Sequence, residues 1–142
     1  MAQKKTVLLA EDEENDVFLM QRAIRKMNEP VLLQVAQDGE QVIEYLLGKN
    51  KYADRHLYPL PALIVLDIKM PRKSGFDVLE WLKADGTLTH IPVVIVTSSA
   101  VQSDVQKACE LGAKEYLVKP VALAELQRLF TATGDFHALH SD

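Results

Sequence analysis

The chain has 142 residues, enough for one compact domain with one core and too few for two ordinary domains. Its net charge of −4 argues against a protein that binds nucleic acid through bulk electrostatics. The single cysteine, Cys109, excludes an internal disulfide, and no segment is long and apolar enough to span a membrane. We therefore expect a cytoplasmic protein with no nucleic-acid or membrane partner.

Strand and helix patterns alternate along the chain. The strand patterns are continuous apolar runs, as in parallel sheets that are covered on both faces, and the helix patterns carry an apolar stripe. In chain order we predict strand 6–10, a helix with its stripe over 17–27, strand 31–36 (weakened by Gln34), helix 41–47, strand 62–67, helix 76–82, strand 93–98, a helix from Ser103, strand 115–119 and helix 123–130. This alternation favours an α/β fold, a doubly wound five-stranded parallel sheet with right-handed crossovers.

Some helix boundaries carry local signals. Ser103 and Gln106 have the spacing of a capping box, which predicts that the fourth helix starts at Ser103 and stops at Gly112. Asp77, three residues after Ser74, is a similar helix-start signal. The connection 48–61 is longer than usual for such a domain.

Polar side chains follow the apolar strands, where burial stops. In an open α/β sheet, ligands bind outside the carboxyl ends of the strands, so these side chains are expected to meet at one edge. The set comprises three carboxylates, two hydroxyls and one ammonium: Glu11, Asp12, Asp67, Thr97, Ser98 and Lys119.

Three carboxylates close together repel one another unless a cation is bound or some are protonated. A hard divalent ion such as Mg²⁺ takes oxygen ligands and is often held by one or two carboxylates plus a phosphate. With such an ion in place, one carboxylate can attack phosphorus, while Thr97 and Lys119 hold phosphoryl oxygens. Taken singly, Asp12 is better explained as a helix N-cap, Thr97 as a strand-end hydroxyl and Lys119 as surface charge.

Taken together, these residues resemble the receiver domain of two-component response regulators. The resemblance covers residues 5 to about 133. It is carried by the acidic pair Glu11-Asp12, the strand LIVLD-x-x-MP with Gly75 beyond it, Thr97-Ser98, and Tyr116-x-x-Lys119-Pro120. It implies a flavodoxin-like fold with strand order 2-1-3-4-5.

The resemblance also implies a role for each residue. Asp67 accepts a phosphoryl group from a phosphohistidine of a sensor histidine kinase, and Ser98 belongs to the same site. Asp12, Asp67 and the backbone carbonyl of Lys69 bind Mg²⁺ or Mn²⁺, with Glu11 assisting through water. Lys119 pairs with Asp67, and Thr97 and Tyr116 switch on phosphorylation. The Lys119-Pro120 bond is expected to be cis. Such a protein is no enzyme beyond its own phosphorylation and slow dephosphorylation.

Two other functions fit parts of this pattern. A phosphatase of the haloacid dehalogenase type also uses an aspartate nucleophile with Mg²⁺, but it needs a second aspartate where this chain has Lys69. A flavodoxin-like cofactor module needs backbone donors and hydroxyls after the first strand, where this chain reads EDEEND.

The domain is expected over residues 1–134, with 135–142 as a tail and no output domain. Phosphorylation is then read out by protein binding, and a homodimer through the fourth helix, fifth strand and fifth helix, extended by Phe136 and Leu139 of the tail, is one candidate. The long 48–61 connection resembles the insertion in single-domain regulators that partner bacterial phytochromes, so a phytochrome-type kinase is a candidate partner.

Overall fold

The computed structural model describes residues 5–27 and 30–131, so the tail and the expectations placed on it lie outside the described residues. Five parallel strands form one sheet in the order β2-β1-β3-β4-β5, which confirms the expected fold class and strand order. The elements are β1 (Lys5–Ala10), α1 (Glu14–Arg25), β2 (Val31–Ala36), α2 (Gly39–Leu47), the 3₁₀ turn η1 (Asn50–Tyr52), β3 (Leu63–Leu66), α3 (Gly75–Asp85), β4 (Val93–Thr97), α4 (Gln102–Glu110), β5 (Glu115–Val118) and α5 (Leu123–Thr131).

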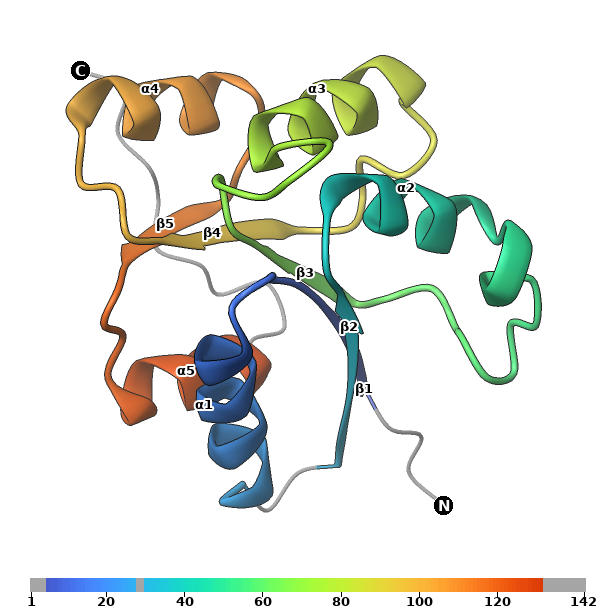
Figure 1. The fold of residues 1–142 in the computed structure, drawn as a ribbon, viewed down its shortest axis with the longest axis horizontal. Coiled ribbons are helices and arrows are strands. Elements are labelled where there is room, and N and C mark those ends of the chain that lie inside the picture. Colours follow the sequence, from blue (N-terminus) through green and yellow to red (C-terminus); the bar gives the residue numbers. More distant parts are fainter. Residues whose placement is uncertain (1–4, 28–29, 132–142) are drawn as a thin grey trace.

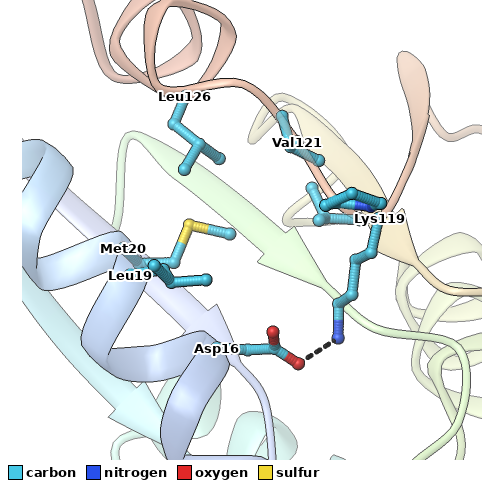
Figure 2. Close-up of a pocket in the computed structure, with 8 residues that line it drawn as sticks. Asp16, Leu19, Met20, Lys119, Val121 and Leu126 are labelled. Atoms are coloured by element: carbon cyan, nitrogen blue, oxygen red, sulfur yellow. Dashed lines mark hydrogen bonds and ion pairs between the residues drawn. The ribbon is translucent and has the colours of Figure 1, made fainter.

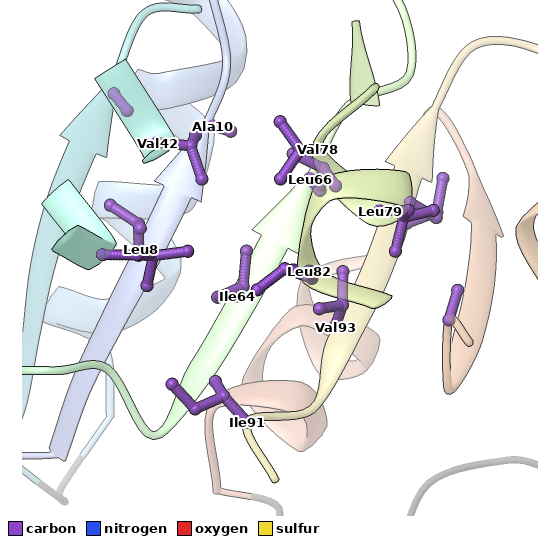
Figure 3. Packing of buried hydrophobic residues seen from close by; sticks show 14 of the residues in the cluster. Leu8, Ala10, Val42, Ile64, Leu66, Val78, Leu79, Leu82, Ile91 and Val93 are labelled. Carbon is purple, nitrogen blue, oxygen red and sulfur yellow. The ribbon is translucent and has the colours of Figure 1, made fainter. Parts of the chain in front are cut away.

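The sheet lies between two layers of helices. Helices α1 and α5 cover one face, and α2, α3 and α4 cover the other (Figure 1). Alternate residues of each strand point to opposite faces, which gives two buried clusters. In Figure 3, Leu8 and Ile64 of the sheet lie with Val42 of α2 and Leu82 of α3 in the larger cluster.

The central strands are buried along their whole length, which explains why their sequences are apolar throughout. All four residues of β3 and all five of β4 are buried. Each register continues in parallel from one strand to the next, for example with Ala10 opposite Leu66 and Thr97 opposite Val118. The strand ends therefore line up, and the residues that follow them share one edge of the sheet.

Helix caps follow the sequence signals at α3 and depart from them at α4. Ser74 and Asp77 form a reciprocal capping box at the start of α3. The prediction that Ser103 starts the fourth helix is wrong, because α4 begins at Gln102 after Val101, which provides no side-chain cap. The hydroxyl of Ser99 instead donates to Asp104 at 2.6 Å, and a buried serine upstream thus ties down this first turn.

The long 48–61 connection is tied to the end of α2 by Arg55. The guanidinium of Arg55 donates to the carbonyls of Tyr45, Leu46 and Tyr58 at 2.8, 2.9 and 3.1 Å. Two of these carbonyls belong to the last turn of α2, where a cation is favourable. The Tyr45 hydroxyl donates to the carbonyl of Pro59 at 2.7 Å, which fixes the far end of the connection.

Over the described ranges, no helix is both long and apolar enough to cross a bilayer.

Candidate functional site

The ammonium of Lys119 gathers three carboxylates at the carboxyl edge of the sheet. Its Nζ lies 2.7 Å from Glu11 Oε1, 2.7 Å from Asp16 Oδ2 and 2.8 Å from Asp67 Oδ2. Glu11 follows β1, Asp67 follows β3 and Lys119 follows β5, as the strand-end argument predicts. Lys119 is not a surface charge, because most of its side chain is buried.

Asp67 is buried and held from two sides. Its Oδ2 accepts from Lys119, and its Oδ1 accepts from the backbone N–H of Lys69 at 3.0 Å. The Lys69 side chain is exposed, so its contact with the site is through its backbone. Behind Asp67 the backbone is close-packed, because a Cβ on Gly75 would lie 2.4 Å from the carbonyl oxygen of Asp67. This close approach explains the glycine that begins α3.

Glu11 is the most deeply buried of the three carboxylates. Burial raises the pKa of the Glu11 carboxyl from 4.5 to about 7, while the hydrogen bond from Lys119 lowers this pKa and the nearby charge of Asp67 raises it. A second donor, the backbone N–H of Glu13, lies 3.2 Å from Glu11 Oε2. The ionised form of Glu11 therefore depends on the positive charge beside it.

Lys119 remains charged because its three partners outweigh its burial. Burial lowers the pKa of the Lys119 ammonium, but the hydrogen bonds to Asp16, Asp67 and Glu11 hold this pKa above its ordinary value. The peptide bond between Lys119 and Pro120 is cis, as expected.

The hydroxyls after β4 have distinct environments. Thr97 is fully buried, and its Oγ1 has no hydrogen-bond partner within residues 5–27 and 30–131. An unpaired buried hydroxyl is costly, so it marks a position where a further acceptor or donor fits. The side chain of Ser98 is exposed, whereas Ser99 is buried.

Tyr116 on β5 reaches the loop that follows β4. Its hydroxyl donates to the carbonyl of Ser99 at 2.8 Å, and its ring packs on the larger core cluster. Burial raises the pKa of the Tyr116 phenol, the hydrogen bond to Ser99 lowers it, and the charges of Asp104 and Asp67 raise it. Tyr116 is thus half-buried and linked to the segment that leads from Thr97 into α4.

The oxygen donors expected to bind a metal ion lie at this edge. Asp12 is exposed, and the N-cap position of α1 belongs to Glu13, so Asp12 is not the helix cap that its place in the sequence also allowed. No group of three or more His, Cys, Asp or Glu residues within the described ranges is arranged to hold a metal ion. Mg²⁺ commonly uses one or two carboxylates, and the exposed Asp12 and the buried Asp67 supply the donor type that it prefers.

Sequence reasoning missed Asp16, which lies in the first turn of α1. Figure 2 shows its carboxylate directed at the ammonium of Lys119. The strand-end argument could not find it, because Asp16 follows no strand. Asp16 is also one of several acidic residues in the EDEEND segment, and nothing in the sequence separates it from its exposed neighbours Glu13 and Glu14.

Comparison with known proteins identifies the family. The model of the response regulator receiver domain matches residues 7–131. Response regulator Rcp1 from Synechocystis sp. is 32% identical over 132 residues, which cover 93% of this chain and 88% of Rcp1.

Solved structures of similar proteins agree with this match. The phosphorylated cyanobacterial phytochrome response regulator RcpA has a TM-score of 0.79 and 31% identity, covering 90% of this chain and 89% of RcpA. The Mn²⁺-bound form of Rcp1 has a TM-score of 0.82 and 30% identity, covering 94% of this chain and 99% of that one. From the family match, these relatives and the shared fold, we conclude that the chain belongs to the response regulator receiver domain family of two-component signalling proteins.

Proposed function

We propose that Asp67 accepts a phosphoryl group from a phosphohistidine of a sensor histidine kinase, and that the chain then signals by changed protein binding. The observation that carries this proposal is the environment of Asp67. Its carboxylate is buried at the end of β3 between the ammonium of Lys119 and the N–H of Lys69. These donors hold a carboxylate oxygen in place for attack on phosphorus.

In the transfer step, one bond to phosphorus forms and another breaks. A carboxylate oxygen of Asp67 forms a bond to phosphorus, and the bond between phosphorus and the imidazole nitrogen breaks. The electron pair of that bond stays on the imidazole, which takes up a proton from solvent as it leaves. Lys119 and Thr97 supply a positive charge and a hydroxyl for the phosphoryl oxygens. That Thr97 Oγ1 has no hydrogen-bond partner in the described part of the chain supports this role.

A divalent ion, Mg²⁺ or Mn²⁺, fits the oxygen donors of the site. We propose that Asp12, Asp67 and the backbone carbonyl of Lys69 hold it, with Glu11 assisting through water. The raised pKa of buried Glu11 supports this assignment, because a buried carboxylate is stabilised by added positive charge. The ion supplies neutralisation of the phosphoryl oxygens when it is bound. The Mn²⁺-bound form of Rcp1 gives independent support from the family.

The readout is proposed to run from Thr97 to the surface formed by α4, β5 and α5. A phosphoryl oxygen offers Thr97 a partner in one state and not in the other, which is the differential interaction that a switch needs. The segment that directly follows Thr97 carries the Ser99 carbonyl, to which Tyr116 donates. The exposed side chains of Val101 and Val118 lie at the start of α4 and the end of β5, which supports a homodimer through this surface.

The candidate kinase is a phytochrome-type kinase. This proposal rests on the similarity to RcpA, which is a phytochrome response regulator. The test is phosphotransfer from the purified, autophosphorylated kinase domains of the same genome, with transfer rates compared at equal concentration. Preferential transfer from a kinase of another type would reassign the partner.

The phosphoacceptor itself is tested with acetyl phosphate and Mg²⁺. Intact mass should show one added phosphoryl group on the unmodified chain and none on Asp67→Asn. Asp54→Asn, at an exposed aspartate of the 48–61 connection, is the matched control and should be phosphorylated like the unmodified chain. Stoichiometric phosphorylation of Asp67→Asn at another residue would reject the assignment.

A further inference from the structure

Of the three carboxylates that contact Lys119 among the described residues, Asp16 is the one that does not follow a strand. It stands in the first turn of α1, and its Oδ2 lies 2.7 Å from Nζ, as close as Glu11 and closer than the 2.8 Å of Asp67. This pair lies at the polar end of a pocket between α1 and α5 (Figure 2), and the pocket has a volume of about 240 Å³.

The hydrogen bonds of the ammonium are fully used in this arrangement. A lysine ammonium has three N–H donors, and here each has one carboxylate acceptor: Glu11, Asp16 and Asp67. In the proposed function, Asp67 becomes the phosphorylated residue and Glu11 assists the metal ion. Two of the three acceptors therefore change their chemistry during phosphorylation, and Asp16 does not.

Asp16 is held in place by the packing of its own helix. One turn further along α1, Met20 is buried in the smaller core cluster together with Leu126 of α5. Leu19 and Met20 face Val121 and Leu126 across the pocket (Figure 2). The carboxylate of Asp16 thus stands on a helix whose position is fixed by apolar contacts rather than by the site itself.

We propose that Asp16 is a positioning residue, which keeps the Lys119 ammonium beside the phosphoacceptor while Glu11 and Asp67 exchange it for other partners. This inference rests on the proposed function of Asp67. With Asp16 in place, Lys119 can turn one N–H towards a phosphoryl oxygen and keep one charged contact that the reaction leaves unchanged. Without Asp16, the long side chain loses this contact and spends less time in the productive position.

A simpler explanation of Asp16 is that its negative charge only complements the dipole of α1. Acidic residues are favourable in the first turn of any helix, and Glu14 is in the same turn of α1. The two residues differ in their contact with Lys119. Glu14 is exposed and is not among the partners of Lys119, whereas the Asp16 side chain is 27% exposed and in contact. The pair Asp16→Asn and Glu14→Gln therefore removes the same charge from the same turn with and without the contact.

The experiment measures phosphorylation of the full chain at saturating acetyl phosphate and Mg²⁺, together with the Kd for Mg²⁺ and the melting temperature. For Asp16→Asn we expect a rate about fivefold lower, the size of one partly exposed charged contact. We expect its Kd for Mg²⁺ to match that of Glu14→Gln, and Asp16→Glu to restore most of the rate. Glu14→Gln should phosphorylate like the unmodified chain.

Several results would contradict this proposal or the function on which it rests. Equal rates for Asp16→Asn and Glu14→Gln would overturn the proposal, as would a Kd for Mg²⁺ that is clearly weaker in Asp16→Asn than in Glu14→Gln. The ammonium signal of Lys119 in nitrogen NMR spectra provides a readout that needs no phosphoryl transfer. In the metal-free protein its protons should exchange faster with solvent in Asp16→Asn than in Glu14→Gln, and equal exchange would also overturn the proposal. If instead the NMR result holds while Asp67→Asn is phosphorylated like the unmodified chain, the function assigned to Asp67 fails and the contact stands.

Discussion

Gly75 lies against the backbone of Asp67, so that a Cβ at position 75 would be 2.4 Å from the Asp67 carbonyl oxygen and 2.8 Å from Ile68 Cα. Contacts this short with backbone atoms can be relieved only by moving the backbone. Gly75→Ala should therefore lower the free energy of unfolding by about 1–3 kcal/mol. It should also slow phosphorylation, because the shift displaces the carboxylate and the Lys69 N–H together.

Gly86 is the control for this substitution. It has a positive φ of 76° and nothing within 4 Å of an added Cβ, so Gly86→Ala tests backbone strain without a clash. A loss of about 1 kcal/mol is expected there, with an unchanged phosphorylation rate. If Gly75→Ala behaved like Gly86→Ala in both measurements, the close packing behind Asp67 would have no bearing on the site.

The stability of the metal-free protein should depend on pH through Glu11. Its pKa is about 7 when folded against an ordinary 4.5, so the folded state binds more protons than the unfolded state between these values. The contribution of Glu11 to stability is therefore fully present below 4.5 and is lost as the pH rises towards about 7. Lys119 stays charged throughout, because its pKa is held above its ordinary value.

Glu11→Gln removes this titration and keeps an acceptor for Lys119. Urea unfolding at a series of pH values, without metal, should show a flatter pH dependence for the variant over that window. Glu40→Gln, at an exposed glutamate of α2, should keep the slope of the unmodified chain. An identical slope for Glu11→Gln would mean that another group is responsible.

Two serines that look alike in sequence should differ in their effect on stability. Ser74 caps α3 through the N–H of Asp77, and Ser74→Ala should cost about 1 kcal/mol. Ser103 is exposed inside the first turn of α4 and caps nothing, so Ser103→Ala should stay within about 0.5 kcal/mol of the unmodified chain. Chemical denaturation of both variants checks the difference, and a larger loss for Ser103→Ala would contradict the assigned start of α4.

Arg55 should contribute strongly to the order of the 48–61 connection. Arg55→Ala leaves the carbonyls of Tyr45, Leu46 and Tyr58 without their charged donor, which should cost about 2 kcal/mol. Amide hydrogen exchange should rise in the connection, while phosphorylation stays unchanged because the connection enters β3 at the end opposite Asp67. Lys49→Ala, an exposed neighbour, should alter neither property.

The sequence alone predicted those site residues that follow strands. Asp67 and Lys119 lie next to each other because parallel strands end at a common edge, and that rule needs no knowledge of side-chain packing. Asp16 could be placed only from the orientation of α1 relative to β5, which is set by contacts such as the packing of Met20 in the smaller core cluster. The predicted cap at Ser103 was wrong, although Ser103 and Gln106 have the spacing of a capping box. The first turn of α4 is instead held by the hydrogen bond from Ser99 to Asp104.

The three acceptors of Lys119 lie 108, 103 and 52 residues before it in the chain. During translation, all three carboxylates are made well before the ammonium that neutralises them. Because β5 is the edge strand beside β4, the other four strands can pair before β5 leaves the ribosome. The nascent sheet then gathers like charges at its carboxyl end until β5 docks, and such long-range contacts form late. The sheet is therefore completed by β5, and the counter-charge of its carboxyl edge, Lys119, directly follows that strand.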